Sequence, residues 1–235
     1  MGNLRWPCVV SWWNLNLPPD SELHLKPTGA GSVKDIWNQA VKDFLATDDD
    51  WLLSAHHDVV FEPDTLLRLL SWDKPLICAL IFMRQAPIIP HIWRAYDGHE
   101  EQMTQRLKDT RNWLYAHPDW IKFGPFVMEP RPFDALVEVD FTSTSLTLIH
   151  RSVLETMRPY VADLWFECDD ELRGGGEDRR FFQNARMAGF PAFVDRSCVA
   201  GHLVGDIPTS VADFIAWDSA SDFLNTGERS DSQTS

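Results

Sequence analysis

Residues 51–61 (WLLSAHHDVVF) place a polar cluster between two apolar runs. The first run predicts a buried central strand over residues 51–57. The cluster His56-His57-Asp58 follows, and buried polar groups of this kind must find solvent, a partner or a metal ion. In an open α/β sheet, ligands bind beyond the carboxyl ends of the strands. This stretch therefore predicts either a ligand site or a solvated turn at the end of a central strand.

The flanking sequence predicts strands that alternate with helices. Ser32 is a good N-cap for a helix through residue 46, and Asp64 can cap a helix that contains Leu66 and Leu70. A second buried strand is expected at residues 76–83. Further strands are expected at residues 7–13, 22–26, 135–139, 145–149, 191–195 and 197–204, and further helices at 152–160 and 179–189. This alternation predicts an α/β fold with a parallel sheet covered by helices.

The length of 235 residues suits one domain, which we expect to span residues 1–224 before a disordered polar tail at 225–235. An insertion at about residues 84–139 is rich in proline and aromatic residues, with one amphipathic helix expected at 100–115. A connection of this length is typical of a lid or an acceptor-binding segment, although a structural flap explains it equally well.

Composition excludes some classes of partner and permits others. The net charge of −14 argues against binding to nucleic acid, because no basic surplus is present to neutralise phosphates. The 11 tryptophans permit stacking on sugars. The sequence shows no apolar run long enough for a transmembrane segment and no signal-peptide core. The four cysteines have no C-x-x-C spacing, which is typical of reduced thiols in a cytoplasmic protein.

Three polar clusters lie at the ends of predicted elements: residues 56–58 (HHD), residues 174–178 (GGGED) and residues 201–202 (GH). Histidine and carboxylate ligands together suit Mn²⁺, and Mg²⁺ where few nitrogens bind. Glycines before a helix allow the backbone to approach a ligand closely at the positive end of the helix. Each cluster alone is equally typical of a mobile loop, a helix-dipole pairing or a surface histidine.

The order of these clusters resembles that of GT-A-fold nucleotide-sugar glycosyltransferases, particularly the family 2-like kind. Residues 51–84 resemble the stretch in which a strand ends in Asp-x-Asp before a helix and a second strand that ends near an arginine. Residues 146–155 (LTLIHRSVLE) resemble the stretch before the acceptor loop. Residues 174–195 resemble the Glu-Asp segment, residues 199–203 (VAGHL) the late histidine, and residues 32–41 the early helix. The resemblance covers about residues 8–205.

The resemblance implies a GT-A-like, Rossmann-like and mostly parallel sheet, and it implies roles for individual residues. Asp58 matches the second aspartate of Asp-x-Asp, which binds the metal ion, and His56 stands where the first aspartate belongs. His202 matches the late histidine ligand, so the implied metal ligands are Asp58, His202 and His56. Asp178 matches the base that accepts the proton of the acceptor hydroxyl, with Glu177 as its neighbour.

The remaining implied residues bind the donor substrate. Arg84 would lie beside the pyrophosphate or sugar, and Asn38 would face the nucleotide. His56 would lie near the ribose, and Gly176 would let the backbone approach the ligand.

The function that this resemblance implies is hexosyl transfer of the EC 2.4 kind, with Mn²⁺ or Mg²⁺ as cofactor. A nucleotide-sugar donor would pass its sugar to a carbohydrate or other hydroxyl acceptor, with inversion. Two alternatives remain open. The first is a non-catalytic nucleotide-sugar or carbohydrate-binding module on the same fold. The second is a metal-dependent hydrolase that uses His56, His57, Asp58 and His202 to activate water.

Overall fold

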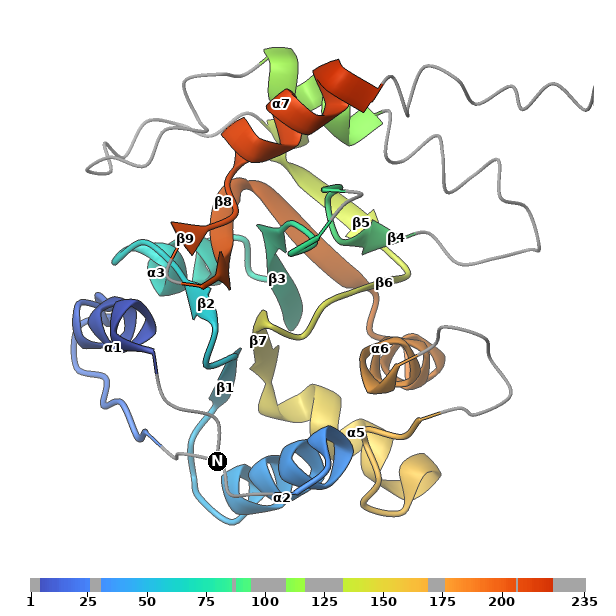
Figure 1. Cartoon of the computed structure of the whole chain (residues 1–235). Coiled ribbons are helices and arrows are strands. Elements are labelled where there is room, and N and C mark those ends of the chain that lie inside the picture. The colour runs from blue at the N-terminus through green and yellow to red at the C-terminus, as the bar shows by residue number, and fades with distance from the viewer. Residues whose placement is uncertain are drawn as a thin grey trace, which may run out of the picture.

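A computed structural model of the chain describes residues 5–25, 31–85, 88–93, 109–116, 133–168, 176–205 and 207–221. The fold is α/β, as predicted, with a central sheet and helices on both of its faces (Figure 1). No helix in these ranges is long and apolar enough to cross a membrane.

The central sheet has the strand order β1-β7-β3-β8-β2. These strands are β1 (Trp51–Ala55), β7 (Leu146–His150), β3 (Leu76–Ile81), β8 (Ala192–Val204) and β2 (Val59–Val60). Strands β5 (Leu136–Val139) and β9 (Ile207–Pro208) also pair with β8, and β4 (Ile92–Trp93) pairs with β6 (Phe141–Thr142) in a separate two-stranded sheet.

The sheet is mixed, and the prediction of a mostly parallel sheet is wrong. Among the described strands only β3 and β8 pair in parallel, and the other pairings are antiparallel. Strands β1 and β3 run in the same direction, because each pairs antiparallel with β7. The prediction that these two strands are parallel to each other is therefore confirmed. They are not neighbours, however, because β7, from a distant part of the chain, lies between them.

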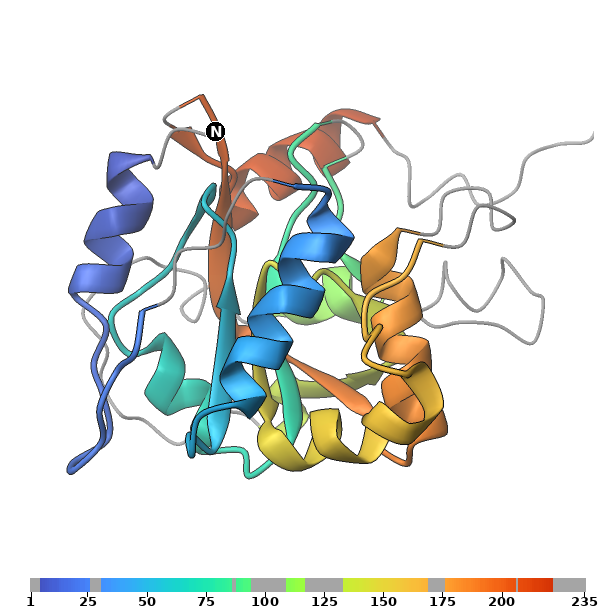
Figure 2. The same ribbon diagram turned by 90° about the horizontal axis from the view of Figure 1, so that it is seen from below.

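Strand β3 is buried along its whole length and separates two cores. Leu76, Cys78 and Leu80 belong to the larger core, whereas Ile77 and Ala79 belong to the smaller one, as the two-residue period of a strand requires. Helices α2 (Val33–Leu45), α5 (Arg151–Val161), α6 (Glu177–Met187) and α7 (Val211–Ser221) contribute to the larger core, and α3 (Thr65–Leu70) and α1 (Trp6–Trp13) flank the smaller one (Figures 1 and 2). Burying one such aliphatic side chain contributes about 1.5–3 kcal/mol.

A β-bulge bends β8 and brings its second half to the site described below. The register with β3 shifts between Ala79, which pairs with Asp195, and Leu80, which pairs with Val199. The buried Asp195 holds the bulge, because its carboxylate accepts hydrogen bonds from the backbone N–H of Ser197 at 2.9 Å and from Trp72 Nε1 at 2.8 Å. The first half of β8 therefore pairs with β5, and the second half pairs with β2 and β9.

Two predicted strands near the start of the chain do not form. Residues 7–13 lie in helix α1, and residues 22–25 have no strand pairing. A short apolar run does not distinguish a buried strand from a helix that buries one face. Pro7 lies in the first turn of α1, where a missing N–H costs nothing.

The other predicted helices are confirmed with small shifts of their ends. Ser32 caps α2 by accepting a hydrogen bond from the backbone N–H of Asp35. Gly189 follows the C-cap of α6 and has a positive φ of 92°, a conformation that glycine adopts readily. Asp64 precedes α3 but makes no capping bond, since its carboxylate pairs with Arg68 at 2.6 Å. The two strands expected at 191–195 and 197–204 are the single strand β8.

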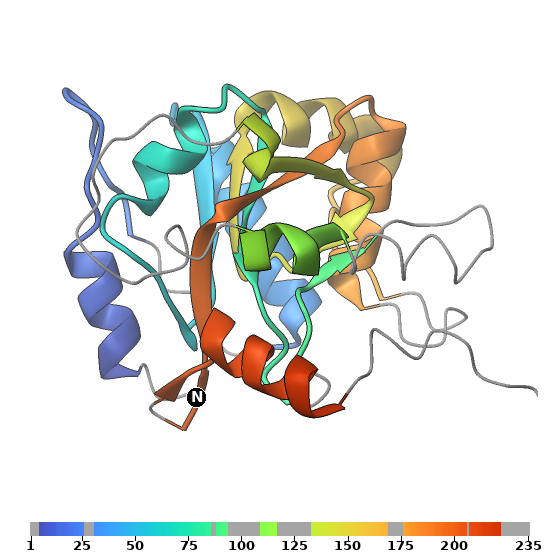
Figure 3. The ribbon, with the colours of Figure 1, turned by 90° about the horizontal axis from the view of Figure 1, so that it is seen from above.

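Within the insertion, residues 109–116 are helical and lie beside α7 (Figure 3). Arg111 joins them to Asp218 at 2.6 Å. Most of the remaining insertion, the glycines at 174–175 and the tail at 225–235 lie outside the described residues.

Candidate functional site

The candidate site lies where the turn after β1 meets strand β8. Asp58 ends this turn, and the next residue, Val59, pairs with His202 of β8. The backbone N–H of Leu203 donates to the Asp58 carbonyl at 2.7 Å, which fixes the register. As a result His202 Nε2 lies 3.7 Å from Asp58 Oδ1. Two residues that are far apart in the sequence, and that were both predicted as metal ligands, therefore lie together.

Arg84, which follows β3, completes this cluster. Its Nη1 lies 2.7 Å from Asp58 Oδ2, and its side chain is about half exposed, at 53%. Burial raises the pKa of Asp58, but the hydrogen bond and charge of His202, with the charges of His57 and Arg84, outweigh burial and hold that pKa well below its usual range. Asp58 is thus ionised at neutral pH.

The carbonyl of Phe82 orients the His202 ring. His202 Nδ1 lies 3.3 Å from this oxygen, and a carbonyl only accepts, so Nδ1 carries the proton. Its Nε2 faces the Asp58 carboxylate, to which it donates a hydrogen bond when protonated, whereas the unprotonated nitrogen offers a lone pair to a cation. A metal-binding histidine commonly donates its other ring N–H to a backbone carbonyl in this way.

Asp58 and His202 are two side chains of the kinds that bind divalent ions. Among the described ranges no group of three or more His, Cys, Asp or Glu side chains is placed to hold a metal ion. The structure therefore brings together two of the three predicted ligands, Asp58 and His202, and His56 is not joined to them in such a group. Mg²⁺ in particular is commonly bound by one or two protein ligands, with phosphate oxygens and water supplying the remainder.

His56 instead lies against α2 and the start of β7. Its ring stacks on Trp37, with ring centroids 5.5 Å apart, and its Nδ1 lies 3.2 Å from Ser145 Oγ. Burial lowers the pKa of His56 to about 4, so the imidazole is neutral at neutral pH. Its Nε2 is buried without a hydrogen-bond partner.

Asp178 lies in the first turn of α6, next to a polar turn that is formed by residues 143–145. Thr144 Oγ1 donates to Asp178 Oδ1, and Ser145 contacts His56. Burial raises the pKa of Asp178 to about 6, and the charge of Glu177 adds to that shift, while hydrogen bonds from Thr144 and Ser143 oppose it. Residues 143–145 therefore connect the predicted base, Asp178, to His56.

Glycine positions in the site differ in what surrounds them. Gly176 caps α6, and a Cβ there would meet no atom within 4 Å. A Cβ at Gly201 would lie 2.6 Å from Pro208 Cβ and 3.2 Å from the Thr209 carbonyl oxygen. Close packing against β9 thus requires glycine at position 201. At position 176 the protein itself leaves room for a side chain, so only a bound ligand would require glycine there.

We expect Gly201→Ala to destabilise the fold by about 1–3 kcal/mol, because the added methyl group must displace β9 from β8. Gly176→Ala is the matched variant, and its cost should stay below about 1 kcal/mol. Urea denaturation of both variants measures the difference. Equal destabilisation would contradict the packing described here.

Asn38 has a structural role that differs from its predicted position at the nucleotide. Its Nδ2 donates to the Phe166 carbonyl at 2.8 Å, and its Oδ1 accepts the Phe166 N–H at 2.9 Å. The side chain is buried, and both of its polar atoms are satisfied by the backbone of one distant residue. The amide ties α2 to the segment after α5.

We expect Asn38→Ala to lower the free energy of unfolding by about 2–4 kcal/mol, because it leaves both backbone groups of Phe166 buried and unpaired. The neighbouring exposed Gln39 provides the control, and Gln39→Ala should change stability by less than about 0.5 kcal/mol. Thermal and urea unfolding would measure both. A loss below about 1 kcal/mol for Asn38→Ala would show that this amide does not hold α2 in place.

Sequence reasoning missed the hydroxyl-rich turn and a second partly buried histidine. The turn Ser143-Thr144-Ser145 precedes a buried strand, and that run of hydroxyls was a signal that could have been used. His91 lies beside β3, where its N–H donates to the Ile81 carbonyl at 2.8 Å. Burial, and then the charge of His202, lower the pKa of His91 to about 4. Its position within a proline-rich insertion gave no signal.

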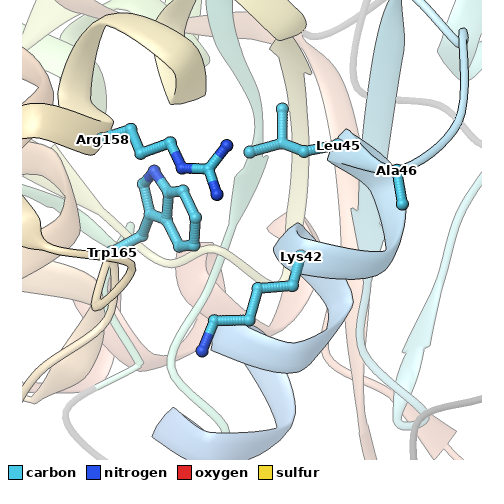
Figure 4. A pocket seen from close by; sticks show the side chains of 5 residues that line it. All are labelled: Lys42, Leu45, Ala46, Arg158 and Trp165. Atoms are coloured by element: carbon cyan, nitrogen blue, oxygen red, sulfur yellow. The ribbon is translucent and has the colours of Figure 1, made fainter.

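A separate pocket of about 230 Å³ lies between α2 and the end of α5 (Figure 4). Its lining consists of Lys42, Leu45, Ala46, Arg158 and Trp165. Both cations lie in the last turns of their helices, where they offset the negative helix ends. Arg158 also pairs with Asp163 at 2.8 Å. The charge in this pocket thus already has a structural explanation, and the pocket is separate from Asp58 and His202.

Comparisons with known proteins show the fold alone. No protein-family model matches the sequence, and no curated protein matches it. Among solved structures the chain is similar to the crystal structure of A197 from STIV, with a TM-score of 0.53 and 16% sequence identity. The match covers 91% of this chain and 87% of that chain.

Proposed function

We propose that the protein is a metal-dependent, GT-A-like glycosyltransferase that moves a sugar from a nucleoside-diphosphate sugar to an acceptor hydroxyl with inversion. The observation that carries the proposal is the position of the Asp58 carboxylate between His202 and Arg84. A carboxylate and an imidazole nitrogen 3.7 Å apart can share one divalent ion, and the adjacent guanidinium can bind a phosphate oxygen.

The residues of this site match the charge changes of glycosyl transfer. Departure of a nucleoside diphosphate builds negative charge on the leaving oxygen, and a divalent ion held by Asp58 and His202 would supply the charge that offsets it. Arg84 would bind the diphosphate directly, since a half-exposed guanidinium can exchange its carboxylate partner for phosphate.

Asp178 would accept the proton of the acceptor hydroxyl. A pKa of about 6 leaves most of this carboxylate ionised at neutral pH and makes it a better base than an ordinary aspartate. Thr144, which donates to Asp178 Oδ1, would hold the side chain in place. Direct displacement with one base predicts inversion at the anomeric carbon.

The test is diphosphate release from a panel of nucleotide sugars, with Mn²⁺, with Mg²⁺ and with a chelator. The proposal predicts metal-dependent release that increases when the correct hydroxyl acceptor is added. Metal-dependent binding without release would favour a non-catalytic binding module. Release that is indifferent to every acceptor would favour hydrolysis, and the absence of both binding and release would contradict the proposal.

A further inference from the structure

Helix α1 presents an apolar stripe to solvent. Trp6, Val10 and Trp13 follow the i, i+4, i+7 spacing of one helix face, and they are 74%, 37% and 88% exposed. The opposite face carries the buried residues Cys8 and Ser11. Ser11 Oγ accepts the backbone N–H of Phe61 at 3.1 Å, which fixes the helix against the chain that follows β2. The stripe is thus held outward by the packing of the other face.

The turn between β8 and β9 extends this stripe. Arg5, just before α1, donates from Nη1 to the carbonyl oxygens of Leu203 and Gly205. Val204 and Ile207 are 49% and 73% exposed in the same hairpin. The hairpin lies beside the first turn of α1 in Figures 2 and 3. We call the set Trp6, Val10, Trp13, Val204 and Ile207 the α1 patch.

The charge of this region differs from that of the rest of the chain. About one residue in seven is Asp or Glu, and the net charge is −14, yet residues 1–19 contain no acidic residue. Arg5 is the only charged residue among them, and α1 itself has none. Helix α1 therefore adds no negative charge that would oppose contact with a phosphate-bearing surface, and the acidic residue between Val204 and Ile207 in the sequence is Asp206.

We propose that the α1 patch docks the protein on the surface of a phospholipid bilayer, with Trp6 and Trp13 at the level of the headgroups. Indole rings combine a large apolar face with one N–H donor and favour that depth. The patch projects from a helix side and a hairpin, and a fluid bilayer can accommodate such a shape without a matching pocket. A helix of eight residues lies on a bilayer and does not cross it, so the binding is peripheral and reversible.

A second copy of the chain fits the patch less well. Two copies of charge −14 repel each other. A bilayer avoids this repulsion, because zwitterionic lipids carry no net charge.

Docking through this patch would bring the candidate site close to the membrane. His202 is only two residues from Val204 along β8, which corresponds to about 7 Å. The inference itself rests on the exposed surface and its charge, and it does not depend on the proposed transferase activity.

The test is flotation of the full chain with vesicles of phosphatidylcholine, with and without added phosphatidylglycerol. We expect the wild type to float with phosphatidylcholine at least as well as with the anionic mixture, because the protein is acidic. Substitution of both exposed indoles (Trp6→Ser with Trp13→Ser) should lower the vesicle partition coefficient at least about tenfold. The control is Tyr160→Ser with Met187→Ser, which removes side chains that are 79% and 86% exposed on α5 and α6 and should leave flotation unchanged.

Several outcomes would overturn the proposal. They are a wild type that floats with neither vesicle, a doubly substituted variant that floats like the wild type, and an equal loss in the control. Light scattering provides the remaining check: a dimer that the tryptophan substitutions dissociate would instead make this face an interface between copies. Both variants alter exposed side chains, so their melting temperatures should match that of the wild type.

Discussion

Replacement of Asp178 by asparagine should abolish most transfer activity and, at the same time, stabilise the fold. Loss of a general base lowers kcat by about 10²–10⁴-fold. The donor KM should change little, because the proposed donor contacts are Asp58, His202 and Arg84. The amide of asparagine keeps an acceptor for Thr144, so the local geometry is retained. Steady-state kinetics measures the loss, and an unchanged kcat would exclude Asp178 as the base.

The stability effect follows from the direction of the pKa shift. The folded-state pKa of Asp178, about 6, lies above the unfolded value, so the folded protein holds the proton more tightly. Stability is therefore lost as pH rises from about 4 to about 6, and the penalty is complete above that range. A shift of about 2 pH units corresponds to at most about 3 kcal/mol. We expect Asp178→Asn to gain about 1–3 kcal/mol at pH 7.5 and little at pH 4.

Urea denaturation at both pH values tests this expectation. Asp48→Asn, at an exposed aspartate, is the control and should show no comparable gain. The wild-type rate should also rise about tenfold per pH unit until it levels off near pH 6, if proton acceptance by Asp178 limits it. An Asp178→Asn variant that is less stable than the wild type at pH 7.5 would show that burial of this carboxylate is not costly.

Replacement of Asp58 by asparagine should remove metal-dependent binding of the donor. The substitution deletes the negative ligand and leaves Arg84 and His202 without the charge that holds them together. Affinity for a nucleoside diphosphate in the presence of Mn²⁺ should fall by at least about a hundredfold. Calorimetric titration with the diphosphate, with and without Mn²⁺, measures this change.

The matched control is Asp163→Asn, at an exposed aspartate that also pairs with an arginine, Arg158, at 2.8 Å. It should leave diphosphate affinity unchanged. Retention of affinity within about twofold in Asp58→Asn would remove Asp58 from the metal site.

The sequence predicts correctly those helices and strands whose structure depends on their own residues. The helix at residues 33–46 was predicted from its apolar spacing, and β3 was predicted from an apolar run that is rich in isoleucine and leucine and follows a proline turn. Helix α1 was predicted as a strand, because its identity depends on the face that it buries against the chain after β2. The position of β7 between β1 and β3 is equally non-local, since only pairing with distant strands determines it.

In the candidate site, too, some residues were predicted, whereas contacts between distant segments were not. The resemblance to GT-A-fold glycosyltransferases allowed Asp58, His202 and Arg84 to be named, and the structure places these side chains in one cluster. The same reasoning put Asn38 at the nucleotide, because sequence does not reveal that the Phe166 backbone occupies both of its polar atoms. Thr144 was missed, since its contact with Asp178 joins two segments that are 34 residues apart.

Crystallographic soaking with Mn²⁺ and a nucleoside diphosphate would locate the proposed metal site. We expect anomalous density for one ion between Asp58 Oδ1 and His202 Nε2, with diphosphate oxygens completing its coordination and Arg84 turned to the phosphate. An ion and diphosphate bound elsewhere on the chain, with Asp58 still paired to Arg84, would contradict this expectation.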